Sequence, residues 1–84
     1  MNITLKLYAT LSDYLPLEAR KSNELPLQTE DGATVADVIG PLNLPQKQVH
    51  LVLINGHYVP PGARRSHALR EGDVLAIWPP IAGG

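Results

Sequence analysis

The chain has 84 residues, the size of one small domain with a modest core, and its apolar content of 44% favours a globular fold over disorder. A net charge of −1 without a basic stripe argues against nucleic-acid binding, and the absence of cysteine excludes disulfides and thiolate metal sites. No apolar run approaches the roughly 20 residues of a membrane span, and the first residues lack the apolar region of a signal peptide. We therefore expect a cytoplasmic protein that does not bind a membrane.

A half-buried strand is predicted over residues 2–8, where apolar residues occupy every second position. Ile3, Leu5 and Leu7 share one side of this strand and are expected to face the core. Tyr8 falls on the opposite side, so an aromatic ring is expected on the outer face of the sheet.

A turn or short helix is predicted over residues 9–17, where apolar residues recur at helical spacing. A second strand is predicted over residues 25–29. Pro26 has no backbone donor, so this strand is expected at a sheet edge, paired antiparallel with the first strand.

One main helix is predicted to begin after Thr34. Thr34 is a suitable N-cap residue, and Asp37 three residues later resembles the second half of a capping box. A single apolar face follows from the spacing of Val35, Val38, Ile39 and Leu42. Pro41 removes a backbone hydrogen bond and clashes with the preceding turn, so the helix is expected to be short.

The second half of the chain is predicted to complete the sheet. Residues 51–54 form a continuous apolar run, which fits a central strand covered on both sides. An Asn-Gly pair follows, the strongest tight-turn signal, and residues 57–59 are expected to return as a short strand. A basic surface loop is predicted over residues 63–70, and the last strand over residues 74–78.

Strands arranged around one helix give an α+β domain, with a mixed sheet of four to five strands and the helix packed on one face. The sequence shows no nucleophile–base pair, phosphate-binding glycine loop or metal-ligand spacing. His50, His57 and His67 stand at scattered positions and are interpreted as surface or structural residues, so no metal site is predicted. The arginines of the basic loop are interpreted as a solvated surface, with steering of an acidic partner as the alternative.

The chain closes with two prolines and two glycines. Its last six residues are Pro79, Pro80, Ile81, Ala82, Gly83 and Gly84. The prolines lack backbone donors, so they end the last strand and favour an extended exit. Glycine has no Cβ, so the end of the chain is narrow enough to enter a channel that a bulkier side chain would block. We therefore predict a folded domain over residues 1–78 and a flexible tail over residues 79–84, with a free carboxylate on Gly84.

Residues 72–84, with the sequence Gly-Asp-Val-Leu-Ala-Ile-Trp-Pro-Pro-Ile-Ala-Gly-Gly, resemble the C-terminus of the MoaD/ThiS family of sulfur carriers. The MoaD branch, the small subunit of molybdopterin synthase, typically ends in an aromatic residue followed by Pro-Pro-x-x-Gly-Gly. Trp78 to Gly84 match this pattern, which is far more specific than the two glycines alone. The resemblance spans most of the chain and implies the ubiquitin-like β-grasp fold.

The resemblance also implies that the chain is a carrier and co-substrate rather than an enzyme, with no bound cofactor. An E1-like activating enzyme of the MoeB or ThiF type would use ATP to adenylate the Gly84 carboxylate, and a persulfide relay would then convert it to a thiocarboxylate. In the MoaD-like case, the tail would enter the large, MoaE-type subunit of molybdopterin synthase and donate its sulfur in molybdenum cofactor biosynthesis.

An exposed aromatic patch of Tyr8, Tyr58 and Trp78 is predicted beside the start of the tail. Alternation in the last strand places Leu75 and Ile77 on the core side and Trp78 on the other side. Tyrosine and tryptophan are enriched at binding hot spots. In the family, the sheet face flanking the tail docks onto both the activating enzyme and the large subunit, so the resemblance implies that these three rings bind partners.

Other functions stay open on the sequence alone. The stretch Ile-Asn-Gly, followed by Val-Pro, within residues 54–60 also resembles the ThiS branch, which supplies sulfur for the thiazole of thiamine. Attack of a lysine amine on the same activated terminus would give protein conjugation, and a tRNA-thiolating carrier is a related possibility. A β-grasp interaction module would use no terminal chemistry, since a fold does not fix a function.

Overall fold

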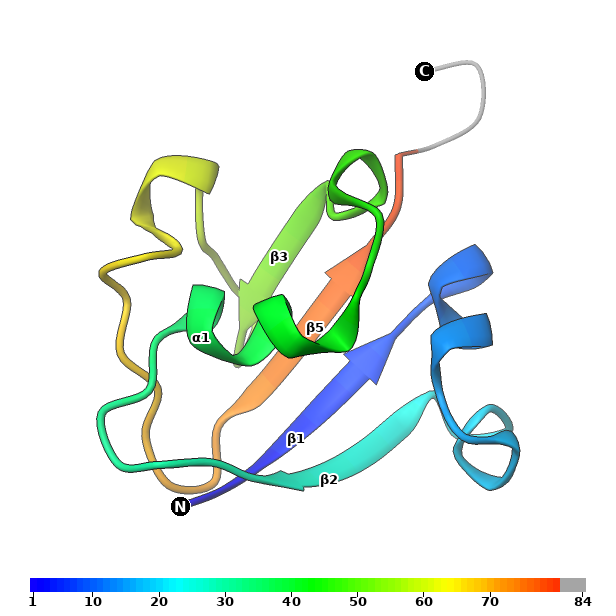
Figure 1. Cartoon of the computed structure of the whole chain (residues 1–84), viewed down its shortest axis with the longest axis horizontal. Coiled ribbons are helices and arrows are strands. Elements are labelled where there is room, and N and C mark those ends of the chain that lie inside the picture. Colours follow the sequence, from blue (N-terminus) through cyan, green and yellow to red (C-terminus); the bar gives the residue numbers. More distant parts are fainter. Residues whose placement is uncertain (81–84) are drawn as a thin grey trace.

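The computed structural model describes residues 1–80, which form a five-stranded mixed sheet with a helix across one face (Figure 1). The strands are β1 (Asn2–Leu7), β2 (Glu24–Gln28), β3 (Leu51–Ile54), β4 (His57–Tyr58) and β5 (Val74–Trp78). The helices are α1 (Val35–Ile39) and the short 3-10 helices η1 (Ala9–Tyr14), η2 (Leu17–Ala19), η3 (Gly40–Leu42), η4 (Gln46–Gln48) and η5 (Pro61–Ala63). The predicted α+β architecture is confirmed. None of the helices within residues 1–80 has the length and apolar character needed to cross a membrane.

The last strand of the chain lies in the middle of the sheet. The strand order is β2-β1-β5-β3-β4, with β5 parallel to β1 and antiparallel to β3. Leu75 and Ile77 of β5 are 0% exposed, because strands flank them on both sides and the core covers them. The sheet is therefore complete only when β5 has been placed between β1 and β3.

The core lies between α1 and the sheet face that α1 covers (Figure 1). Ile3, Leu5 and Leu7 of β1 are all buried there, as the strand alternation predicts. Val35 and Val38 of α1 belong to the same buried cluster. The apolar faces of strand and helix thus meet in one core, and burial of this apolar surface is the main stabilising contribution to the fold.

Reciprocal hydrogen bonds between Thr34 and Asp37 fix the start of α1, as predicted. The Asp37 N–H donates to Thr34 Oγ1 over 3.2 Å, and the Thr34 N–H donates to Asp37 Oδ2 over 2.9 Å. The helix continues into η3, where Pro41 has no N–H to donate, and ends at Asn43 in the left-handed region with φ of 57°. The prediction of a short helix is confirmed.

The prediction for β3 was wrong in one respect, because this strand is covered on one side only. Its central position is confirmed, with β5 on one side and β4 on the other. Val52 and Ile54 are buried, whereas Leu51 and Leu53 are only half-buried. Since α1 covers one face of the sheet, every second residue of the apolar run faces away from the core. Burial in the core therefore does not explain why Leu51 and Leu53 are apolar.

The remaining predictions for the first half of the chain are confirmed. β2 forms one edge of the sheet, with Pro26 opposite Thr4 of β1. Residues 9–17 adopt short 3-10 turns, and Leu11 and Leu15 from this segment are buried in the core.

We predict that Leu75→Ala lowers the free energy of unfolding by about 2–5 kcal/mol, because it leaves a cavity at the centre of the sheet. Leu17→Ala removes the same atoms from a side chain that is 72% exposed, and it should change the free energy of unfolding by less than about 0.5 kcal/mol. Urea unfolding followed by circular dichroism measures both variants at constant m-value. Similar losses for the two variants would contradict the packing described here.

Candidate functional site

The sheet face opposite α1 carries a strip of apolar side chains near the end of β5. We call this strip the outer face, and it consists of Tyr8, Leu51, Leu53, Tyr58, Ala76 and Trp78. In the register of the sheet, Leu51 is opposite Trp78. Leu53 has Ala76 opposite it on β5 and Tyr58 opposite it on β4. Residues directly opposite each other on neighbouring strands share a face, so these side chains form one surface.

Tyr8 and Trp78 stack on each other in the outer face. Their ring centroids are 4.3 Å apart and their planes are 3° from parallel. The Tyr8 N–H donates to the Ile77 carbonyl over 3.1 Å, which continues the contact between the two strands by one residue beyond β1. Both rings are partly exposed. The structure therefore brings two of the three predicted aromatic residues into contact.

Tyr58 lies on the same face but apart from the stacked pair. It is 57% exposed on β4, at the edge of the sheet, and β3 separates it from β5. Within residues 1–80, the stack of Tyr8 and Trp78 is the only aromatic pair. Leu51 and Leu53 of β3 lie between Tyr58 and the stacked rings, so the surface is a mixed aromatic and aliphatic strip. These two leucines were not predicted to be part of an exposed surface, because their apolar run was interpreted as a strand buried on both faces.

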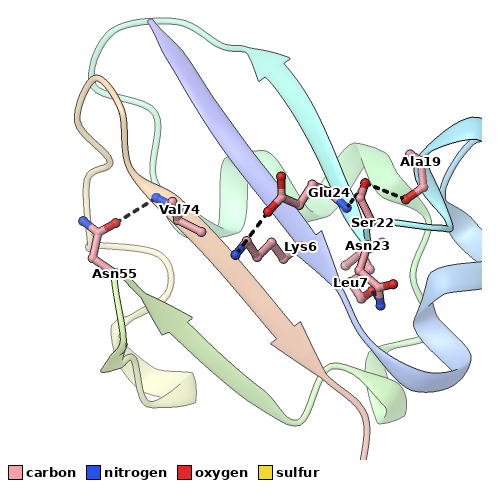
Figure 2. A network of polar contacts seen from close by, with 8 residues as sticks. All are labelled: Lys6, Leu7, Ala19, Ser22, Asn23, Glu24, Asn55 and Val74. Carbon is pink, nitrogen blue, oxygen red and sulfur yellow. Dashed lines mark hydrogen bonds and ion pairs between the residues drawn. The ribbon is translucent and has the colours of Figure 1, made fainter.

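Polar side-chain contacts join neighbouring segments of the sheet (Figure 2). Lys6 Nζ lies 3.3 Å from Glu24 Oε1, in an ion pair between β1 and β2. Beyond β3, Asn55 Oδ1 accepts a hydrogen bond from the Val74 N–H over 2.9 Å, which joins the turn after β3 to the start of β5. The ion pair is partly exposed, so its contribution to stability is small.

The chain leaves the sheet beside the stacked rings. β5 ends at Trp78, and the His50 N–H donates to the Trp78 carbonyl over 3.2 Å. Pro79 is half-buried and Pro80 is exposed. The other predicted tail residues lie outside the described residues: Ile81, Ala82, Gly83 and Gly84. The stack of Tyr8 and Trp78 thus stands directly before the predicted tail.

The titratable side chains of the described residues do not gather into a metal site. Within residues 1–80, no three histidine, cysteine, aspartate or glutamate side chains lie close enough together to hold a metal ion. His50, His57 and His67 are exposed, as predicted for surface residues. The feature that distinguishes the described surface near the end of β5 is therefore the apolar outer face.

Comparison with known proteins gives one family match. A family model described as Mut7-C ubiquitin matches residues 1–82, which is nearly the whole chain. A search of curated proteins finds no match.

Solved structures share the fold over the full chain. Small archaeal modifier protein 1 (SAMP1) from Haloferax volcanii has 24% sequence identity over 100% of both chains and a TM-score of 0.71. A candidate molybdopterin converting factor subunit 1 from Pyrococcus furiosus has 19% identity over 96% of this chain and 99% of its own, with a TM-score of 0.70. The thiamine biosynthesis protein ThiS from Geobacter metallireducens has 17% identity over 100% of both chains, with a TM-score of 0.66. These likenesses confirm the predicted β-grasp fold and the resemblance to MoaD/ThiS carriers.

One similar structure includes a second subunit. It is the complex of subunits 1 and 2 of the molybdopterin-converting factor from Helicobacter pylori, with 17% identity over 100% of both chains and a TM-score of 0.63. A protein with this fold therefore assembles with a different subunit in that organism.

We predict an energetic coupling of about 0.5–1.5 kcal/mol between Tyr8 and Trp78, because stacked rings contribute stability beyond the area they bury. A double-mutant cycle with Tyr8→Leu and Trp78→Leu, followed by urea unfolding and far-UV circular dichroism, measures this coupling. The same cycle with Tyr58→Leu in place of Tyr8→Leu is the control, and its coupling should be near zero. Equal coupling in the two cycles would show that the stack has no special role.

Proposed function

Because the chain belongs to the Mut7-C ubiquitin family and has the fold of ubiquitin-like sulfur carriers and modifiers, we propose that it is a cytoplasmic sulfur carrier for molybdopterin synthesis. The observation that carries the proposal is the stack of Tyr8 and Trp78 at the end of β5, followed at once by Pro79 and Pro80. In the proposed function, the stacked rings belong to the surface that partners bind, and the segment that follows them in the sequence ends in Gly84.

The proposed chemistry takes place at the Gly84 carboxylate. An E1-like activating enzyme binds ATP, and the carboxylate attacks the α-phosphorus with loss of pyrophosphate. The resulting acyl adenylate has a good leaving group, so the terminal sulfur of a persulfide displaces AMP. A thiol then cleaves the new disulfide and leaves a thiocarboxylate on Gly84. In this scheme the chain supplies neither a catalytic group nor a bound cofactor.

Two features favour the molybdopterin branch. The segment from Trp78 to Gly84 has the aromatic-Pro-Pro-x-x-Gly-Gly pattern of the MoaD branch. The fold is shared with the candidate subunit 1 from Pyrococcus furiosus and with the two-subunit complex from Helicobacter pylori. By analogy, we propose that the chain is the non-catalytic small subunit of a molybdopterin synthase and inserts its tail into a MoaE-type large subunit.

The outer face is the proposed docking surface for both the activating enzyme and the large subunit. Tyr8, Tyr58 and Trp78 supply rings of the kind enriched at binding hot spots. Leu51 and Leu53 add aliphatic area between them. A contiguous apolar strip on a small domain is typical of a surface that a partner covers.

A second candidate function is protein modification, which the likeness to SAMP1 over the whole of both chains favours. In that case a lysine amine of a target protein attacks the adenylated Gly84, and an isopeptide bond forms instead of a thiocarboxylate. A ThiS-like role in thiamine synthesis is favoured less, because the ThiS branch commonly lacks the double proline that Pro79 and Pro80 provide.

We predict that incubation of the protein with an E1-like activating enzyme, ATP and a persulfide donor raises its intact mass by the difference between one sulfur and one oxygen atom. The physical reason is replacement of a single Gly84 carboxylate oxygen. Mass spectrometry of the whole chain measures the change.

Two control variants test where the sulfur is placed. Deletion of Gly84 and extension of the chain by one alanine should both abolish the mass gain, since either change removes the carboxylate from its position. Covalent adducts with other proteins that need ATP but no sulfur donor would instead support the modifier function. No product in either assay, with several activating enzymes, would refute both functions and leave the interaction-module alternative.

We predict that Trp78→Ala weakens binding to a MoaE-type large subunit by about tenfold or more, because it removes a central ring of the outer face. Leu17→Ala, at a 72% exposed position of η2, is the control and should leave the affinity unchanged. Isothermal titration calorimetry measures both affinities, and circular dichroism checks the fold. An unchanged affinity of the Trp78 variant would refute the outer face as the docking surface.

A further inference from the structure

A groove of about 470 Å³ lies on the side of the molecule that carries α1. One wall is formed by α1 and η3, and the other by residues 44–49 and residues 61–65. The groove lies beside α1, which covers the sheet face opposite the outer face (Figure 1).

The groove combines an apolar lining with a positive charge. Ile39, Leu44 and Val49 line it, and each is partly buried against the core and partly accessible. The charged side chains among the lining residues are Arg64 and Arg65. Neither arginine forms an ion pair with any residue in the described range 1–80. The groove thus combines two cationic side chains that have no acidic partner in the described range with partly accessible aliphatic groups.

The Arg64 side chain is held in place by backbone carbonyls of the neighbouring residues 49–50. Its Nη1 donates to the Val49 carbonyl over 3.3 Å, and its Nη2 donates to the His50 carbonyl over 3.1 Å. Its own carbonyl accepts from the Ala36 N–H of α1 over 2.8 Å. The buried Arg64 Nε has no hydrogen-bond partner within residues 1–80. The positioned guanidinium lines the groove, and its Nη1 and Nη2 each carry a second N–H. It is therefore suited to a carboxylate, which accepts hydrogen bonds and balances the charge.

The charge of the chain is unevenly distributed around this groove. Residues 38–70 contain four of the seven lysines and arginines and none of the eight aspartates and glutamates. This segment supplies most of the groove, from Ile39 to Arg65. The chain as a whole carries a net charge of −1, so the local positive charge does not reflect the overall composition. It favours an acidic ligand at this place on the surface.

We propose that the groove binds an acidic segment of a partner protein, with an aliphatic side chain of the segment against Ile39, Leu44 and Val49. Carboxylates of the segment pair with Arg64 and Arg65. The proposal goes beyond the carrier function and does not depend on chemistry at Gly84. Because His50 contacts both Arg64 and the Trp78 carbonyl through its backbone, the groove also lies close to the chain exit.

The test uses the full, isotope-labelled chain and two synthetic peptides. One peptide has the sequence Asp-Asp-Leu-Ile-Asp-Asp, and the other replaces each aspartate by asparagine, so that only the charge differs. Titration of the acidic peptide should shift the backbone amide resonances of Ile39, Gly40, Leu44 and Arg65. The amide peptide should bind much more weakly. The affinity of the acidic peptide should fall as the ionic strength rises, because exposed charge pairs are screened by salt.

Two variants with the same change in net charge show whether binding depends on the groove. Arg65→Glu should weaken binding of the acidic peptide roughly fivefold or more, since it places a like charge in the groove. Lys21→Glu changes the net charge equally at an exposed position outside the groove lining and should leave the affinity unchanged. Deletion of Gly84 should also leave it unchanged, so failure of the carrier function and failure of this proposal give different results.

Several results would overturn the proposal. These are equal affinities for the two peptides, equal losses in the Arg65 and Lys21 variants, or shifts confined to outer-face residues such as Leu53 and Tyr58. Absence of shifts at millimolar peptide would also overturn it. If sedimentation shows salt-sensitive self-association that Arg65→Glu abolishes, the groove is occupied by a second copy of the chain and the proposed partner is wrong.

Discussion

The pairing of β5 with both β1 and β3 is the constraint on which the rest of the structure depends. β5 comes last in the chain yet occupies the centre of the sheet, and its residues Leu75 and Ile77 are fully buried. A buried central strand has a fixed position and direction, so the point at which the chain leaves the sheet is also fixed. Trp78 stands at that point, held by a neighbouring strand on each side. The predicted tail therefore begins from a rigid base.

A sheet with one helix layer has two unequal faces, and within residues 1–80 no second helix layer covers the other face. The outer face keeps apolar side chains that the core does not use, and the rings of Tyr8 and Trp78 are already stacked in the isolated chain. A pre-ordered surface loses less conformational entropy on binding. The groove beside Arg64 differs from the outer face, because two arginines line it together with aliphatic side chains.

Local sequence signals predicted most of the secondary structure. The alternation in β1, the hydrogen bonds between Thr34 and Asp37, and the edge position of the strand containing Pro26 all depend on residues that are close in sequence. Alternation, capping and the missing proline donor act over a few residues, so they can be identified without knowing the rest of the fold. The helix end near Pro41 follows for the same reason.

The contacts between distant segments could not be predicted in this way. The stack of Tyr8 with Trp78, the exposure of Leu51 and the anchoring of Arg64 depend on which strands are neighbours and in which register, and packing of the whole core sets both. By itself, the sequence determined where strands and helix form and which motif follows Trp78, because these are properties of short segments. Only the tertiary structure decided which side chains share a surface, because that depends on β5 lying between β1 and β3.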